Sequence, residues 1–147
     1  MKDEKQVEVL LVEDKDEDIE MTCRALRNNN LANRIHVEKD GQAALDFIYG
    51  CSPEDKCAMA KVILLDIKLP GISGLELLEK LKSDERTRFI PVVMLTSSEE
   101  EVDLVRTYDL GVNSYIVKPV DFADFARAMK EIGFYWLVMN RCPETTG

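Results

Sequence analysis

The sequence is poor in the side chains from which soft-metal and disulfide sites are built. It has four cysteines and a single histidine, His36, among 147 residues. No two cysteines form a C-x-x-C pair, so no zinc-binding set is predicted, and we expect reduced thiols. Glycine-rich phosphate loops of the forms G-x-x-x-x-G-K-[ST] and G-x-G-x-x-G are also missing. Nucleotide binding is therefore not supported.

Long apolar runs and an excess of positive charge are missing as well. No apolar run approaches the roughly 20 residues that span a bilayer. Glu13 and Asp14 interrupt the first apolar stretch early, so no secretory leader is predicted. Acidic residues number 28 against 19 basic ones, a net charge of −9. This balance argues against nucleic acid and anionic membranes as partners, and we expect a cytoplasmic protein.

Short apolar runs alternate with longer amphipathic segments along the chain. The apolar runs are continuous, which is typical of parallel strands covered on both faces. We predict one domain over residues 6–141, with flexible ends at 1–5 and 142–147. Its predicted strands are 7–12, 34–38, 62–65, 91–95 and 114–117, and its predicted helices are 16–28, 41–49, 73–82, 98–110 and 121–140. The sequence therefore predicts a doubly wound α/β fold with five parallel strands.

Polar side chains follow four of the predicted strands at their carboxyl ends. Glu13 and Asp14 follow the first strand, Asp66 the third, Thr96 the fourth and Lys118 the fifth. A parallel sheet brings these ends to one edge, where such sheets bind ligands. Three close carboxylates require protons or a cation, and oxygen ligands select a hard ion such as Mg²⁺. We expect Lys118 to pair with the acids at rest and with a phosphoryl group in the active state.

Each of these residues also has an ordinary structural explanation. Asp66 by itself is most often a turn acid, and Glu13 and Asp14 by themselves suit the start of the next helix. The acids at 16–18 are interpreted as a solvated first helical turn. The occurrence of the set at successive strand ends, in one order, favours a shared site.

At these residues the sequence resembles the receiver domain of two-component response regulators. The matching segments are Glu13-Asp14, "LLDIKLPGISG" at 64–74, "VVMLTSS" at 92–98 and "YIVKP" at 115–119. The resemblance covers about residues 6–140. It implies the flavodoxin-like (βα)5 receiver fold with strand order 2-1-3-4-5.

The resemblance implies a role for each candidate residue. Asp66 is the implied acceptor of a phosphoryl group from a kinase phosphohistidine or an acyl phosphate. Lys118 and Thr96 are implied to contact the phosphoryl oxygens, and Thr96 and Tyr115 to form a conformational switch pair. The peptide bond between Lys118 and Pro119 is expected to be cis.

A divalent cation, Mg²⁺ or Mn²⁺, is the implied cofactor. Asp14 and Asp66 are its implied ligands, with Glu13 acting mainly through water and the backbone carbonyl of Lys68 completing the set. Many receivers carry Asn or Met where this chain has Lys68. We therefore predict that the Lys68 ammonium affects the lifetime of the phosphoryl group.

Three segments narrow the resemblance to single-domain regulators paired with phytochrome-type sensor kinases. They are the polar insertion at 50–60, "TYDLGVNSYIVKP" at 107–119 and "GFYWLVMNRCP" at 133–143. The aromatic residues of the last strand and helix cannot all face one core, so we predict a homodimer through these two elements. The implied partner is a sensor histidine kinase.

The predicted function is a phosphorylation-driven switch that acts through protein contacts and is not an enzyme for other substrates. One alternative is an Asp-nucleophile phosphohydrolase, which would usually carry a second Asp where Lys68 stands. Another is a binding module of the same fold that works without phosphorylation. The complete set of acids, Thr96 and Lys118 argues against that last alternative.

Overall fold

The computed structural model describes residues 9–28, 34–50, 60–108, 112 and 114–132. Within these ranges the chain forms one parallel sheet of order β2-β1-β3-β4-β5. Its strands are β1 (Val9–Val12), β2 (Ile35–Glu38), β3 (Val62–Asp66), β4 (Val92–Thr96) and β5 (Ser114–Val117). The predicted fold class and strand order are confirmed.

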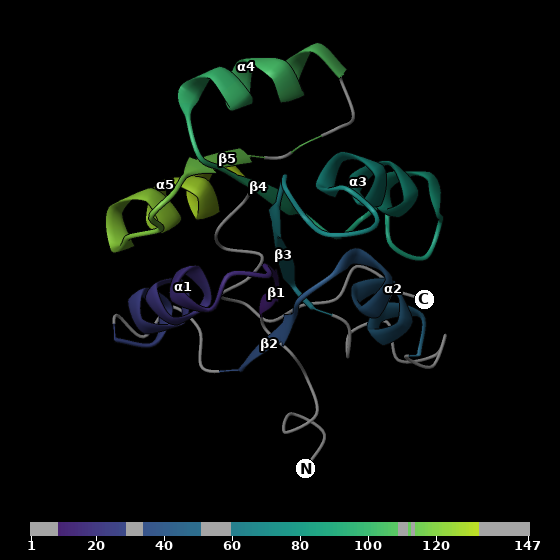
Figure 1. The fold of residues 1–147 in the computed structure, drawn as a ribbon, viewed down its shortest axis with the longest axis horizontal. Helices are drawn as coiled ribbons and strands as arrows, with labels where there is room; N and C mark the ends of the chain where they lie inside the picture. Colours follow the sequence, from purple (N-terminus) through teal and green to yellow (C-terminus); the bar gives the residue numbers. More distant parts are fainter. Residues whose placement is uncertain (1–8, 29–33, 51–59, 109–111, 113, 133–147) are drawn as a thin grey trace.

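Helices alternate with the strands and cover both faces of the sheet (Figure 1). They are α1 (Asp16–Asn28), α2 (Gly41–Tyr49), α3 (Gly74–Ser83), α4 (Glu99–Tyr108) and α5 (Phe122–Glu131). Helices α1 and α5 pack on one face, and α2 and α3 on the other. No helix in the described ranges is long and apolar enough to cross a bilayer.

Burial on both faces explains why the strand sequences are continuously apolar. Leu10 and Val12 of β1 face the core beneath α2 and α3. Val9 and Leu11, from the same strand, face the core beneath α1 and α5. All four are fully buried, so an alternating polar pattern is impossible in this strand. The apolar runs thus fix the two-faced sheet that carries the site.

The connection from β3 to α3 holds the helix close to the end of the central strand. Gly71 has a φ of 74°, a left-handed conformation that favours glycine after Pro70. Ser73 caps α3 through a capping box with Glu76. At Gly74 a Cβ atom would lie 2.3 Å from the carbonyl oxygen of Asp66. Only glycine therefore lets α3 begin directly against the strand that ends in Asp66.

Several sequence-based predictions fall on residues outside the described ranges. The domain limits at 6 and 141 and the two flexible ends stay predictions, as do Cys51, Cys57 and Cys142. Cys23 in α1 is a free thiol. Most of the insertion at 50–60 and all of the segment at 133–143 also lie outside. The predicted helix 121–140 is seen from Phe122 to Glu131, and Asp121 is its N-cap.

Candidate functional site

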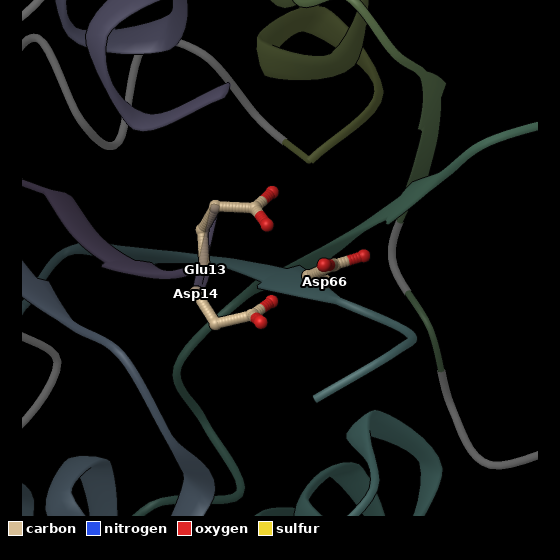
Figure 2. Close-up of side chains that lie close together, drawn as sticks. All are labelled: Glu13, Asp14 and Asp66. Carbon is tan, nitrogen blue, oxygen red and sulfur yellow. The ribbon is translucent and has the colours of Figure 1, made fainter. Parts of the chain in front are cut away.

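Three carboxylates meet at the carboxyl edge of the sheet. The parallel register pairs Val12 of β1 with Leu65 of β3, so the next residues, Glu13 and Asp66, come to the same level. Glu13, Asp14 and Asp66 each offer an oxygen, and these oxygens lie within 4.8 Å of one another. Figure 2 shows the side chains of Glu13 and Asp14 turned to the same side, toward Asp66. The predicted acidic site is thus present.

Lys118 neutralises part of this acidic set. Its Nζ lies 3.0 Å from Glu13 Oε1, 3.0 Å from Asp18 Oδ2 and 3.4 Å from Asp66 Oδ2. The peptide bond to Pro119 is cis, as expected. The backbone amide of Lys118 donates to the carbonyl oxygen of Thr96 at 2.7 Å, which joins the ends of β4 and β5. The predicted resting pair between Lys118 and the acids is present in this structure.

The interpretation of Asp18 as a solvated first-turn acid is wrong, because its carboxylate contacts Lys118. The sequence held a signal for this contact. Asp18, Thr22 and Leu26 follow one another at intervals of four residues, and Thr22 and Leu26 are buried. Residues four apart share one face of a helix. Asp18 therefore lies on the core-facing side of α1, at its end nearest the site.

Burial and the close approach of charged groups shift the pKa values of Glu13 and Lys118. Burial and, after it, the neighbouring Asp66 raise the pKa of Glu13 from its usual 4.5 to about 7, although Lys118 opposes this rise. Burial alone would lower the pKa of Lys118, yet its contacts with Asp18 and Glu13 raise that pKa above its usual value. Three acids contact one ammonium group and Asp14 lies beside them, so the site carries a surplus of negative charge that a cation can neutralise.

Several buried polar atoms of the site make no hydrogen bond within the described part of the chain. They are Asp14 Oδ1, Asp66 Oδ2 and Thr96 Oγ1. Buried polar groups in proteins are nearly always hydrogen-bonded, so such atoms call for an explanation. Two free carboxylate oxygens suit a hard divalent cation. A free hydroxyl beside them suits a donor to an anionic oxygen.

Two loops flank Asp66 at the mouth of the site. The backbone amide of Lys68 approaches Asp66 Oδ1 at 3.4 Å. The Lys68 ammonium lies 3.0 Å from Glu101 Oε2 in the first turn of α4. The sequence singles out Lys68 but does not indicate Glu101 as its partner, because the rotation of α4 about its axis is set only when the helix packs on the sheet.

Tyr115 lies on β5, next to the strand that carries Thr96. Met94 pairs with Tyr115 and Thr96 with Val117 in the register of β4 and β5. The Tyr115 ring is half-buried, and the Arg106 guanidinium carbon lies 5.1 Å from its centroid. Arg127 donates to the Tyr115 carbonyl oxygen at 3.0 Å. The ring therefore lies at the surface between α4 and α5, on the strand next to the one that carries Thr96.

Comparison with known proteins accounts for this arrangement. A response regulator receiver domain matches residues 9–130. The chain belongs to the response regulator receiver family. The receiver match covers the whole sheet and every residue of the candidate site.

The similarity to known proteins covers most of this chain. The probable methanogenesis regulatory protein FilR2 of Methanothrix harundinacea is 41% identical over 92% of this chain and 86% of its own. The structure of the bacteriophytochrome response regulator AtBRR is 46% identical, covers 89% of this chain and 95% of its own, and has a TM-score of 0.81. The phosphorylated cyanobacterial phytochrome response regulator RcpA is 32% identical, with coverages of 95% and 99% and a TM-score of 0.70.

Proposed function

We propose that this receiver domain is a phosphorylation-driven switch in which Asp66 accepts a phosphoryl group from a sensor histidine kinase. The observation that carries the proposal is the position of Asp66. Asp66 is the last residue of the central strand, beside the carboxylates of Glu13 and Asp14 and the ammonium of Lys118. Its Oδ2 makes no hydrogen bond to any residue that the structure describes. The phosphorylated form of RcpA shows that a similar receiver carries this modification.

In the proposed reaction a carboxylate oxygen of Asp66 attacks the phosphorus atom of a phosphohistidine. An oxygen–phosphorus bond forms while the nitrogen–phosphorus bond breaks, and the imidazole leaves with the electron pair and takes up a proton. Charge spreads over the three phosphoryl oxygens during this transfer. Lys118 supplies a fixed positive charge to them, and Thr96 Oγ1 supplies a hydrogen-bond donor that has no other partner among the described residues.

A divalent cation, Mg²⁺ or Mn²⁺, is the proposed cofactor. Asp14 and Asp66 would bind it directly, Glu13 mainly through water, and Lys68 through its backbone carbonyl. The oxygen-only donor set and the free oxygens of Asp14 and Asp66 support this assignment. When bound, such an ion neutralises charge on the carboxylates and on the incoming phosphoryl oxygens.

Output is proposed to pass through Thr96 and Tyr115 to the surface of β5 and α5. A phosphoryl group would draw the Thr96 hydroxyl toward Asp66, and the Tyr115 ring would then turn inward. Tyr115 begins from a half-buried position, so its motion would change the exposed surface. We propose that a homodimer forms through β5 and α5, in the cytoplasm, without nucleic acid or membrane contacts.

The kinase partner is proposed to be of the phytochrome type. The names of AtBRR and RcpA support this pairing, whereas the name of FilR2 points to a different regulatory pathway. The sensory input is therefore best tested directly against several kinases.

Phosphotransfer in a mixture tests the proposal. Sensor kinases of the phytochrome and other classes are first autophosphorylated with radiolabelled ATP and then mixed with the chain. We expect label on the wild-type chain and on Asp84→Asn, and none on Asp66→Asn. Rapid turnover of phosphate esters by the same preparation would instead favour the phosphohydrolase alternative. Labelling of Asp66→Asn at the wild-type rate would reject Asp66 as the acceptor.

A further inference from the structure

The side chain of Lys68 joins the loop after β3 to the first turn of α4. Its ammonium contacts Glu101 Oε2 at 3.0 Å. The other oxygen, Glu101 Oε1, accepts a hydrogen bond from the Ser97 backbone amide at 2.7 Å. One carboxylate thus connects both loops that flank Asp66 and Thr96. The Glu101 side chain is only 14% exposed, so this position is well defined by its surroundings.

The two lysines near Asp66 are held very differently. Lys118 is 11% exposed and contacts three carboxylates, including Asp66 itself. Lys68 is 70% exposed, and its ion pair is with Glu101, outside the acidic set. Because the ammonium of Lys68 stays largely in solvent, its attraction to Glu101 is screened and weak. Lys68 is therefore the cation that can change partner at small cost.

We propose that Glu101 is a positioning residue for Lys68, which it holds away from Asp66 until a phosphoryl group replaces it as the partner of the ammonium. This inference rests on the proposed phosphorylation of Asp66. Phosphorylation adds negative charge and strong acceptor oxygens two residues before Lys68. The phosphoryl group offers the ammonium more negative charge and more acceptor oxygens than the single carboxylate of Glu101. The exchange also removes the tether between the β3–α3 loop and α4.

The exchange makes Glu101 a competitor of the phosphoryl group. In the wild-type chain, binding of a phosphoryl group to Lys68 must first break the contact with Glu101. Glu101→Gln keeps an acceptor for the Ser97 amide but loses the charge that attracts Lys68. The phosphorylated state should therefore form more readily in this variant, and only while Lys68 is present.

Beryllofluoride, a non-covalent mimic of the phosphoryl group, tests this competition on the full chain with Mg²⁺. Affinity is measured by ¹⁹F NMR for the wild type, Glu101→Gln, Lys68→Met and the double variant. We expect Glu101→Gln to bind about two- to fivefold more tightly, the range set by an exposed ion pair. In the Lys68→Met background the same substitution should change nothing. Glu100→Gln, an exposed acid on the same turn, is the matched control for the loss of one charge.

The outcomes separate this inference from the function beneath it. An equal gain in both backgrounds, or an equal gain from Glu100→Gln, shows a general charge effect and overturns the inference alone. A wild-type chain that fails to bind beryllofluoride with Mg²⁺ overturns the proposed function as well. Amide resonances of Ser97 and Glu101 give an independent readout. They should shift on binding in the wild type and shift much less in Lys68→Met.

Discussion

Two polar clusters in the chain have similar components and differ in how far their bonding is complete. The acceptor cluster lies at the carboxyl ends of the strands and comprises Glu13, Asp14, Asp18, Asp66, Thr96 and Lys118. The loop cluster precedes β4 and comprises Tyr49, Asp84, Arg86 and Thr87. In the loop cluster Asp84 accepts three hydrogen bonds from Arg86, and Thr87 Oγ1 donates to the Leu81 carbonyl at 2.6 Å. The Arg86 guanidinium also covers the Tyr49 ring at 4.3 Å.

The difference lies in unmatched charge and unmatched hydrogen-bonding groups. The loop cluster balances one carboxylate with one guanidinium. The acceptor cluster sets four carboxylates against one ammonium, and three of its buried oxygens make no hydrogen bond within the ranges that the structure describes. A complete cluster stabilises the fold, whereas an incomplete one is stabilised further by whatever binds there. The comparison therefore separates structural polar groups from functional ones within a single chain.

Removing the basic side chain from each cluster should give the largest difference in the free energy of unfolding. Lys118→Met leaves buried acids without compensation, so we expect the free energy of unfolding to fall by about 3 kcal/mol in chelator. Added Mg²⁺ should restore part of the loss. Arg86→Met, in the exposed loop cluster, should cost far less. Urea denaturation checks both, and comparable losses for the two variants would break the comparison.

Two of the buried threonines, Thr87 and Thr96, form a matched pair. Thr87 and Thr96 are 1% and 0% exposed, but only Thr87 Oγ1 has a hydrogen-bond partner among the described residues. Thr87→Val should lower the free energy of unfolding by about 1 kcal/mol, whereas Thr96→Val should leave it unchanged or raise it. Thermal or urea unfolding measures the difference. A larger loss for Thr96→Val would mean that its hydroxyl is already satisfied in the resting chain.

Neutralising one acid in each cluster should change the free energy of unfolding in opposite directions. Asp66→Asn removes repulsion with Glu13 and Asp14, so we expect the free energy of unfolding of the metal-free chain to rise by about 1 kcal/mol. Asp84→Asn weakens its bonds with Arg86 and should destabilise the chain. With saturating Mg²⁺ the wild type should become more stable than Asp66→Asn, because the ion binds the ionised site. Destabilisation by Asp66→Asn without metal would contradict the surplus of charge.

The clusters should also give opposite slopes of stability against pH. Between about 4.5 and 7 the folded chain keeps a proton on Glu13 that the unfolded chain releases, so stability falls as pH rises. Asp84 has its pKa lowered from 3.8 to about 2, chiefly by its bonds with Arg86, so its contribution is lost as pH falls through that window. Urea unfolding in metal-free buffer, repeated across this pH range, measures both slopes. Glu13→Gln should flatten the upper slope and leave the lower one.

The sequence alone was sufficient to predict the sheet and most of the acceptor cluster. Continuous apolar strands imply a parallel sheet, and a parallel sheet brings Glu13, Asp66 and Lys118 to one edge whatever the helix rotations are. Contacts made by helices depend on those rotations. For this reason Asp18 was misread, although its spacing from Thr22 and Leu26 indicated the buried face. The contact between Lys68 and Glu101 had no comparable signal, since Glu101 is one of three consecutive acids in α4.

The close approach of α3 to β3 was also beyond sequence reasoning. Gly74 reads as an ordinary residue after a helix cap, yet a Cβ there would meet the backbone of Asp66 and Ile67. The requirement arises from the packing of two elements and not from the local backbone conformation. Such close approaches become visible only when the elements are placed in space.

Covalent modification of the intact chain tests the central claim most directly. The chain is incubated with an acyl phosphate and Mg²⁺, and its mass and peptides are then measured by mass spectrometry. The account predicts one added phosphoryl group, located on Asp66, that is absent in Asp66→Asn and in chelator and present in Asp84→Asn. An unmodified wild-type chain, or an equal modification of Asp66→Asn, would contradict it.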